Sequence, residues 1–317
     1  MSFSVQKRAK LFLPTRRKIK KKRIFTKTNI ILYLMILPIV IYYIIFHFIP
    51  MLGIVIAFAD FRISGFKAWV GFENFRKLFS LTFFWESFRN TWTFVFYNYV
   101  LAFPAPIILA LLLNEIRSSK FKKVIQTISC LPYFVSWVVV AGIFIALLSP
   151  STGYINTIIK AFGGQPIYFL ASPEAFPPLL TFIRIWKGVG YSTIIYLAAL
   201  SGIDEELYEA AVIDGANRWK QTLHITLPGL KTTILVILIL SMAGVLNLFE
   251  PVYVFQNPMI NSTAEVLDTY TYKTGIVQGR YAMATAMGLF KSLIALVLII
   301  VTNILSKKLT DDGESII

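Results

Sequence analysis

Residues 209–228 read Glu209-Ala-Ala-Val-Ile-Asp-Gly215-Ala-Asn-Arg-Trp-Lys-Gln-Thr-Leu-His-Ile225-Thr-Leu227-Pro228, a polar, helix-forming stretch between two long apolar runs. We call residues 201–228 the polar island. Loops that connect membrane spans are usually short, whereas this one is long enough for two short helices and a turn. A structured, water-facing element of this kind indicates a membrane subunit on which a soluble partner acts.

The composition of the chain places it in a membrane. Its 317 residues are 56% hydrophobic, with a mean hydropathy of +0.68, and runs of about 20 apolar residues predict transmembrane helices. Cys130 is the only cysteine, which excludes an intrachain disulfide and a cysteine metal cluster. The formal charge of +15 is typical of nucleic-acid binders. The cations are concentrated beside the spans, however, so we expect no nucleic acid as a partner.

Six transmembrane helices are predicted, which makes the chain an all-α polytopic membrane protein. The predicted spans are 29–48, 91–113, 124–149, 178–200, 230–255 and 282–306. The first apolar run continues past Pro50, so this span is expected to be long, tilted or kinked. The domains are then a basic tail (1–28), a six-span transmembrane domain (29–306) that contains the segment 201–228, and a C-terminal tail (307–317).

The distribution of Lys and Arg predicts the orientation of the spans. Eleven of these residues precede residue 29, four lie at 117–123, three at 218–231 and two at 307–308, which places twenty on one side. The opposite loops hold eight. Because positive loops stay in the cytoplasm, both termini and the polar island are predicted to be cytoplasmic. The first apolar stretch is too long for a signal peptide, and the basic tail is expected to lie against anionic lipid.

The external loops are too short to form a separate domain. The apolar residues of the first loop, from Trp69 to Phe79, recur at a spacing that suggests an amphipathic helix at the interface. The third loop, 150–177, is rich in Gly and Pro, and the fifth covers 256–281. A substrate taken from outside must therefore be captured by another protein.

Within the polar island, the sequence predicts a helix, a sharp turn and a second helix. The acidic run Asp204–Glu206 suits the start of the first helix, because carboxylates stabilise a helix N-terminus by about 0.3–1 kcal/mol each. Gly215 can take the left-handed conformation that ends it. Asn217 can cap the second helix, and Pro228 is expected to stop that helix before the next span. The small pair Ala210-Ala211 leaves a smooth surface that another protein can approach closely.

The spacing Glu-Ala-Ala, three residues, Gly, nine residues, Ile, one residue, Leu-Pro resembles the EAA motif of importer permeases of the ATP-binding-cassette (ABC) family. Every position is matched, by Glu209, Ala210, Ala211, Gly215, Ile225, Leu227 and Pro228. The resemblance extends to segments 49–58, 70–75, 107–115, 131–141 and 196–204, which look like the LplB-like branch of the binding-protein-dependent carbohydrate permeases, related to the maltose permeases.

This resemblance implies a type I ABC importer permease fold in a bacterial cytoplasmic membrane. It implies a second, homologous permease subunit, two copies of a cytoplasmic ATPase that binds ATP and Mg, an external solute-binding protein and an oligosaccharide substrate. It also implies that the polar island, including Asp214 and Ala216, is the coupling helix, with Glu209 near a basic residue of the ATPase. The chain itself has no phosphate-binding G-x-x-x-x-G-K-[ST] loop, so we expect it to bind no cofactor and not to be an enzyme.

The substrate path is predicted from ionisable residues within spans, which are costly in a membrane and are usually functional. Asn247 lies one helical turn before Glu250 and is expected to share its helical face. Nearby aromatic residues offer flat surfaces to sugar rings. The predicted residues are Tyr97, Tyr99, Arg184, Trp186, Lys187, Tyr191, Asn247, Phe249, Glu250 and Lys291. An internal ion pair of Glu250 with Lys187 or Lys291 is the alternative. Because Arg184, Lys187 and Lys291 outnumber Glu250, an acidic, uronate-containing oligosaccharide is one substrate the sequence favours.

Other classes of transporter remain open at this point. An ABC permease for peptides or other small solutes would share the polar island. An ion-coupled secondary transporter would need its own ion site and often shows inverted repeats, and a channel would show a polar pore stripe or filter. No such repeat, stripe or filter is evident in the sequence.

Overall fold

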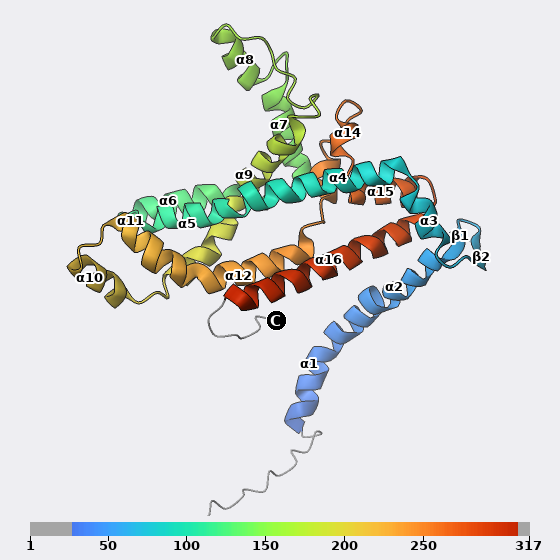
Figure 1. The fold of residues 1–317 in the computed structure, drawn as a ribbon, viewed down its shortest axis with the longest axis horizontal. Helices are drawn as coiled ribbons and strands as arrows, with labels where there is room; N and C mark the ends of the chain where they lie inside the picture. The colour runs from blue at the N-terminus through green and yellow to red at the C-terminus, as the bar shows by residue number, and fades with distance from the viewer. Residues whose placement is uncertain (1–26, 310–317) are drawn as a thin grey trace, which may run out of the picture. The chain divides into compact units, whose positions relative to one another are not determined.

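The computed structural model describes residues 27–309 and divides into two units between Leu52 and Gly53, which are described separately below (Figure 1). The predicted tails, 1–28 and 307–317, lie almost entirely outside the described residues.

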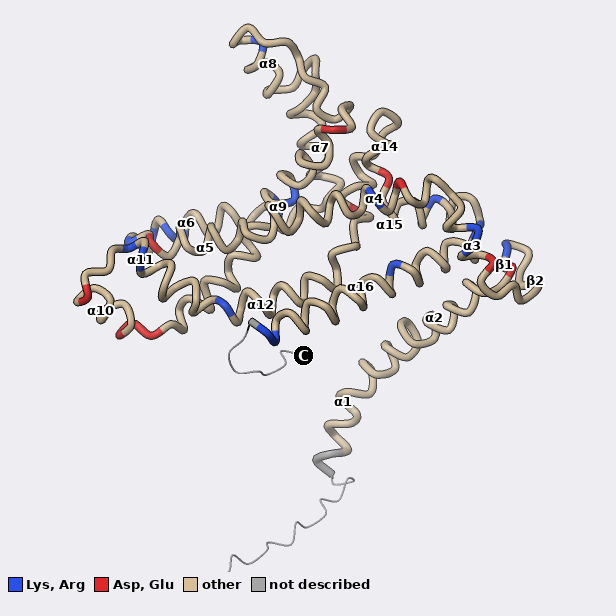
Figure 2. Tube along the Cα trace, viewed as in Figure 1, with Lys and Arg blue, Asp and Glu red and all other residues tan. Residues whose placement is uncertain are grey.

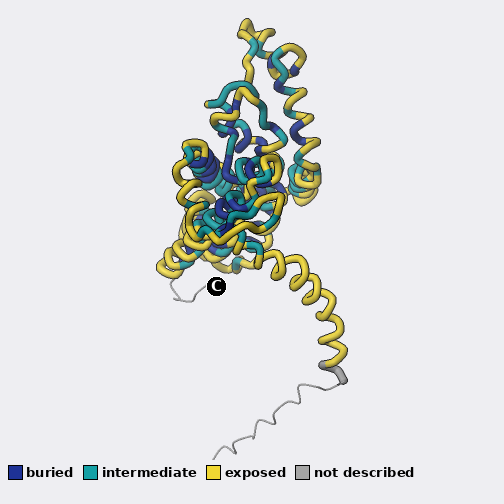
Figure 3. Tube along the Cα trace, turned by 90° about the vertical axis from the view of Figure 1, so that its right-hand side faces the viewer, coloured by how far each residue is buried: buried dark blue, intermediate teal, exposed yellow. Residues whose placement is uncertain are grey.

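The first unit is a single helical rod. Helix α1 (Lys27–Tyr43) continues through a π-helical turn (Ile44–Phe48) into α2 (Ile49–Met51). The helix does continue past Pro50, which sits in the first turn of α2, where its missing N–H costs nothing. Every side chain from Ile30 to Leu52 is exposed (Figure 3), and nearly all are apolar. A helix that is apolar all round must meet lipid or another protein.

The second unit opens with a small hairpin that the sequence did not predict. A 3-10 helix (Leu52–Phe58) leads into antiparallel strands β1 (Ala59–Arg62) and β2 (Gly65–Trp69), which turn at Gly65 with φ of 101°. The predicted interfacial helix is only α3 (Glu73–Phe79), so the placement of Trp69 in that helix was wrong. Asn74 ties α3 to the hairpin by donating to the carbonyls of Ala57 and Ala59, each at 2.9 Å.

Long helices form the body of this unit (Figure 1). Their bounds are α4 (Thr82–Tyr97), a π-turn (Asn98–Ala102) and α5 (Pro104–Asn114); α6 (Ser119–Cys130), a 3-10 turn (Leu131–Phe134), α7 (Trp137–Leu148) and α8 (Tyr154–Ala161); α9 (Phe176–Leu200); α10 (Glu205–Ile213) and α11 (Arg218–Gln221); a π-turn (Thr222–Thr226) and α12 (Leu227–Gly244); α13 (Phe249–Tyr253), α14 (Asn261–Ala264) and α15 (Leu267–Tyr272); and a π-turn (Lys273–Val277) and α16 (Tyr281–Leu309).

Two predicted spans are interrupted in the structure. The span predicted at 124–149 bends by 104° between Phe134 and Trp137, because Pro132 ends the first segment and Ser136 caps the next by accepting from the Val139 N–H. The span predicted at 230–255 ends at Gly244. The second span begins at Thr82 rather than at residue 91, because polar residues there face the protein interior.

Four helices in the described part of the chain are long and apolar enough to cross a membrane, or five if the bent pair is one span. The one predicted span not among these is 178–200, which corresponds to α9. Its 25 residues suffice in length, but it carries Arg184 and Lys187. The chain is thus a multi-pass helical membrane protein, and the count of six spans stays a prediction.

The core lies around α9. Its residues Phe176, Leu180 and Ile183 pack with Phe94 of α4 and with the segment that follows α12. Gly190 of α9 lies against α6, where a Cβ would come within 2.2 Å of the Ser129 backbone. Small residues that allow helix backbones to approach are typical of packing in membranes.

Candidate functional site

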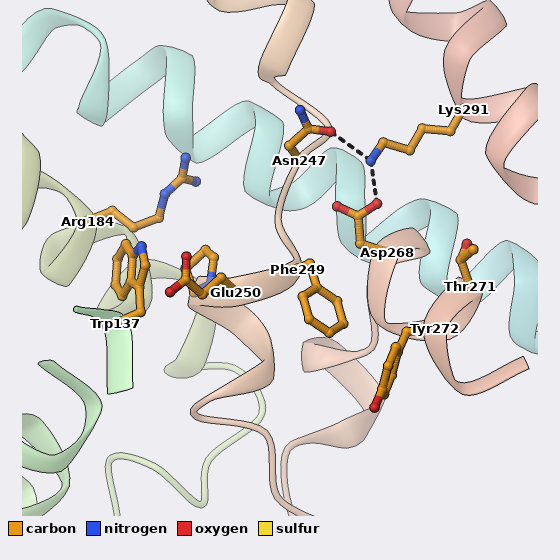
Figure 4. Close-up of a pocket in the computed structure, with 10 residues that line it drawn as sticks. Trp137, Arg184, Asn247, Phe249, Glu250, Asp268, Thr271, Tyr272 and Lys291 are labelled. Atoms are coloured by element: carbon orange, nitrogen blue, oxygen red, sulfur yellow. Dashed lines mark hydrogen bonds and ion pairs between the residues drawn. The ribbon is translucent and has the colours of Figure 1, made fainter. Parts of the chain in front are cut away.

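A cavity of about 710 Å³ opens beside the break in the fifth predicted span (Figure 4). It lies between the start of α7, the middle of α9, the segment from the break to α13, and α15 with α16. Its lining residues are Trp137, Arg184, Asn247, Phe249, Glu250, Pro251, Asp268, Thr271, Tyr272 and Lys291. Five predicted substrate-path residues are therefore brought together: Arg184, Asn247, Phe249, Glu250 and Lys291.

One side of the cavity is a polar network of side chains around the break between α12 and α13. Lys291 donates to Asn247 Oδ1 at 2.8 Å and forms an ion pair with Asp268. The other oxygen of Asp268 accepts the backbone N–H of Leu248 at 2.8 Å. The Leu248 N–H lies beyond the end of α12 and has no helical carbonyl to bond, so it donates to a carboxylate instead. The alternative in which Lys291 pairs with Glu250 is not what the structure shows, because Lys291 pairs with Asp268 of α15 instead.

Two charged side chains line the opposite side of the cavity, of which Glu250 is exposed and Arg184 is partly buried. Arg184 of α9 lies beside Trp137, and Glu250 of α13 lies next to them (Figure 4). Neither side chain makes a hydrogen bond or an ion pair with another residue in 27–309. Arg184 does interact electrostatically with Tyr99. Neither charge is balanced by an opposite charge within bonding distance among the described residues, so both are available to a polar ligand.

Aromatic rings line the cavity between these two sides. Phe249 stacks on Tyr253 with centroids 4.9 Å apart and packs against Tyr272 at 5.2 Å. Because α12 ends at Gly244, Asn247 lies in the break and Glu250 in α13, so the prediction that they share one helical face was wrong. The break instead turns Phe249 and Glu250 toward the cavity.

The other predicted path residues lie outside this cavity. Lys187 donates to the Tyr133 carbonyl at 2.7 Å, so the alternative in which it pairs with Glu250 is not what the structure shows either, and Tyr191 stacks on the Tyr133 ring at 4.0 Å. The remaining three make packing or local contacts: Trp186 meets Phe144, Tyr99 hydrogen-bonds Ser241 at 3.1 Å, and Tyr97 contacts Phe96.

Sequence reasoning missed Asp268 as a site residue, together with Trp137, Thr271 and Tyr272. Asp268, Thr271 and Tyr272 lie in the predicted loop 256–281, where hydropathy gives no signal, and Trp137 lies in the middle of the predicted span 124–149. Asp268 lies 23 residues before Lys291 in the chain, and only the fold brings them together. It also changes the charge count, since the cavity holds two cations and two carboxylates rather than an excess of cations.

The polar island forms the predicted helix, turn and helix. Asp204 caps α10 by accepting the Glu206 N–H at 3.0 Å. At the other end of α10, Gly215 has φ of 74°, its N–H bonds the Val212 carbonyl, and the Ala216 N–H bonds the Ala211 carbonyl at 2.8 Å. These two bonds make a Schellman motif.

Asn217 caps α11 as predicted, by accepting the Lys220 N–H at 2.9 Å. The expected stop at Pro228 was wrong, because the helix runs from Arg218 to Gly244 through the π-turn Thr222–Thr226. The wider turn leaves room for the proline ring at the start of α12.

Helix α10 presents an unpartnered surface. It has no buried residue, and carboxylates gather along it at one end of the long helices, with the hairpin at the other (Figures 1 and 2). Glu209 is exposed and forms no ion pair within residues 27–309. Val212 and Ile213 are 63% and 86% exposed, which is unusual for large apolar side chains in a short helix beside water.

Comparison with known proteins shows which family this chain resembles. The family model for "Binding-protein-dependent transport system inner membrane component" matches residues 102–311. The polygalacturonan/rhamnogalacturonan transport system permease protein YteP of Bacillus subtilis is 45% identical over 304 residues, 94% of each chain. Protein LplB of the same organism is 44% identical over 286 residues, covering 89% of this chain and 90% of that one.

A solved structure agrees in fold. The crystal structure of a bacterial ABC transporter involved in the import of the acidic polysaccharide alginate has a chain that matches with a TM-score of 0.85 at 39% identity, covering 90% of this chain and 98% of that one. The chain described here therefore belongs to the family of binding-protein-dependent transport system inner membrane components.

Proposed function

We propose that this chain is a permease subunit of an ATP-driven importer for oligosaccharides that carry uronate groups. The observation that carries the proposal is the cavity, which Arg184 and Glu250 line together with the aromatic rings of Phe249 and Tyr272. Support also comes from similar proteins: YteP is named for polygalacturonan and rhamnogalacturonan, and the structural relatives transport alginate. All three are acidic polysaccharides.

The cavity chemistry suits a sugar acid. A guanidinium binds a carboxylate through two parallel hydrogen bonds, so Arg184 would hold one uronate group. Glu250 would accept from sugar hydroxyls, and Phe249 with Tyr272 would face the apolar side of a ring. Lys291 is already paired with Asp268, so it would position the break rather than contact the substrate. The acidic preference therefore rests on Arg184 and not on an overall excess of cations.

Energy would enter at the polar island. The exposed surface of α10, with Glu209, Ala210, Val212 and Ile213, would seat in a groove of a cytoplasmic ATPase that binds ATP and Mg. Closure of the ATPase pair would move α10, and the membrane helices would rock between inward- and outward-facing states. A homologous permease would supply the second half of the path, and an external solute-binding protein would deliver the sugar. The orientation with both termini in the cytoplasm is part of this proposal.

The experiment that tests the function uses the purified complex of both permeases and the ATPase. ATP hydrolysis is measured with the solute-binding protein added empty, loaded with trigalacturonate, or loaded with maltotriose. The proposal expects stimulation by the trigalacturonate-loaded protein above both others.

Each alternative has its own outcome in that experiment. Stimulation by maltotriose alone would keep sugar import but reject the acidic preference. A further arm adds the solute-binding protein loaded with a tripeptide, and stimulation in that arm alone would favour a peptide permease. No stimulation by any loaded protein would reject ATP-driven import through this chain.

A further inference from the structure

A second cavity, of about 810 Å³, lies between the hairpin, α3 and the turn before α16, within the second unit. We call it the hairpin cavity. Its lining residues are Asp60, Phe61, Arg62, Ile63, Ser64, Asn74, Lys77, Gln278, Gly279, Arg280, Ala282 and Met283. None of them lines the cavity beside the broken span, so the two are separate.

The hairpin cavity lies where three helices end. The first apolar helix stops at Phe58, directly before β1, while α4 begins at Thr82 and α16 at Tyr281. The ends converge in space, since the Phe61 and Tyr281 rings are 6.4 Å apart and Ile63 covers Gly279 so closely that a Cβ there would lie 2.8 Å from it. Residues just beyond the ends of spans lie at the depth of lipid headgroups.

The charges of the hairpin cavity leave one cation available. Arg62 pairs with Asp60 at 3.1 Å, and Lys77 pairs with Glu73 at 2.6 Å. Arg280 is exposed and has no carboxylate within 4.0 Å among the described residues. Counting these three cations against the two carboxylates, the local net charge is +1.

Exposed aromatic rings beside the cavity indicate what surrounds it. Phe66, Trp69 and Phe72 are 53%, 65% and 74% exposed, and the Phe66 and Trp69 rings pack 5.2 Å apart. Such rings would be unfavourable in water but are enriched at the membrane interface, where one end meets acyl chains and the other meets headgroups. The hairpin therefore has the composition of an interfacial anchor.

We propose that the hairpin cavity binds the headgroup of an anionic phospholipid. A phosphate diester carries one negative charge, which matches the one available cation, and Arg280 would hold it through two hydrogen bonds. Ser64 and Gln278 line the same space and can bond the hydroxyls of a glycerol headgroup. A choline headgroup would instead bring a second positive charge toward Arg62 and Lys77. The lipid would thereby fasten the external ends of the first and last spans.

The test is native mass spectrometry of the full chain in detergent, titrated with dioleoylphosphatidylglycerol and dioleoylphosphatidylcholine. A cation near the membrane surface favours anionic lipid by roughly fivefold. Arg280→Gln should therefore lower the preference for phosphatidylglycerol by roughly fivefold, while Arg280→Lys should retain most of it. Lys160→Gln is the matched control, because Lys160 is also exposed on a predicted external loop but lies outside the hairpin cavity.

The comparison is made between variants because the N-terminal tail carries eleven cations in every one of them. A wild-type chain that retains the two lipids equally would overturn the proposal, as would an equal loss in Arg280→Gln and Lys160→Gln. Trigalacturonate is added in a separate titration. If Arg280 governs binding of that sugar and not of phosphatidylglycerol, the hairpin cavity is a saccharide site and the lipid proposal fails.

Discussion

Asp268 connects the break after α12 to α16 at the cavity beside the broken span. It accepts from Leu248 at the break and pairs with Lys291, and the two side chains are only 15% and 19% exposed. In Asp268→Asn, the amide oxygen can still accept from Leu248, but the NH₂ group cannot balance Lys291. Because removing one partner of a fully buried pair costs about 3–5 kcal/mol, we expect a loss of about 2–3 kcal/mol here. Chemical denaturation in detergent measures it.

A second ion pair serves as a control that separates a positioning role of Asp268 from its contribution to stability. Lys273 and Glu265 also form a partly buried ion pair, 2.5 Å apart, and neither residue lines the cavity. Glu265→Gln should destabilise the protein similarly but leave the substrate concentration for half-maximal uptake unchanged, whereas Asp268→Asn should raise it. The double variant Asp268→Asn with Lys291→Met should recover stability. An equal rise of that concentration in both single variants would show that Asp268 has no positioning role.

In the proposed function, Arg184 is the side chain that binds the uronate group. A hydrogen bond to a charged group contributes about 1.5–3 kcal/mol, so Arg184→Gln should weaken the apparent affinity for trigalacturonate by roughly 10- to 100-fold. Uptake of a neutral trisaccharide, where measurable, should change little. Lys187→Gln is the control, because Lys187 lies one turn along α9 and contacts the Tyr133 carbonyl instead. Equal losses for both sugars in Arg184→Gln would contradict the assignment.

The polar island is the element whose geometry the sequence predicts best. Gly215 takes the left-handed conformation, and an alanine there would cost about 1–2 kcal/mol because its Cβ meets the backbone carbonyl. Gly215→Ala should change the angle between α10 and α11, and should reduce ATP hydrolysis stimulated by the loaded binding protein severalfold. Gly202→Ala is the control, since its φ is ordinary and its Cβ would make only a 3.4 Å contact. Normal stimulation in Gly215→Ala at equal expression would contradict the coupling role.

Local signals explain why the polar island was predictable and the cavity was not. The caps at Asp204 and Asn217 and the turn at Gly215 each depend on residues within a few positions, so the sequence contains their whole cause. The break after Gly244 has no comparable cause: residues 230–255 read as one apolar run. It exists because Asp268 and Lys291, from other elements, satisfy the groups that the helix releases. The hairpin was missed for a similar reason, since its strands are too short to show alternation.

At the scale of the whole molecule, the orientation in the membrane can be tested directly. Replacing Cys130 by Ser removes the only native thiol, and single cysteines are then introduced as Ser151→Cys or Asp214→Cys. A membrane-impermeant maleimide should label Ser151→Cys in intact cells and Asp214→Cys only after lysis, because the charge distribution predicts that the polar island is inside. Labelling of Asp214→Cys in intact cells would reverse the orientation and remove the basis for ATPase docking.

In the proposed function, energy enters through α10 from an ATPase while the sugar passes beside the broken span. The most direct measurement is uptake of labelled trigalacturonate into proteoliposomes that contain both permeases and the ATPase, with the binding protein outside. We predict uptake that requires enclosed ATP and the loaded binding protein, and that falls in Gly215→Ala and in Arg184→Gln. Uptake driven by an ion gradient without ATP would contradict the account.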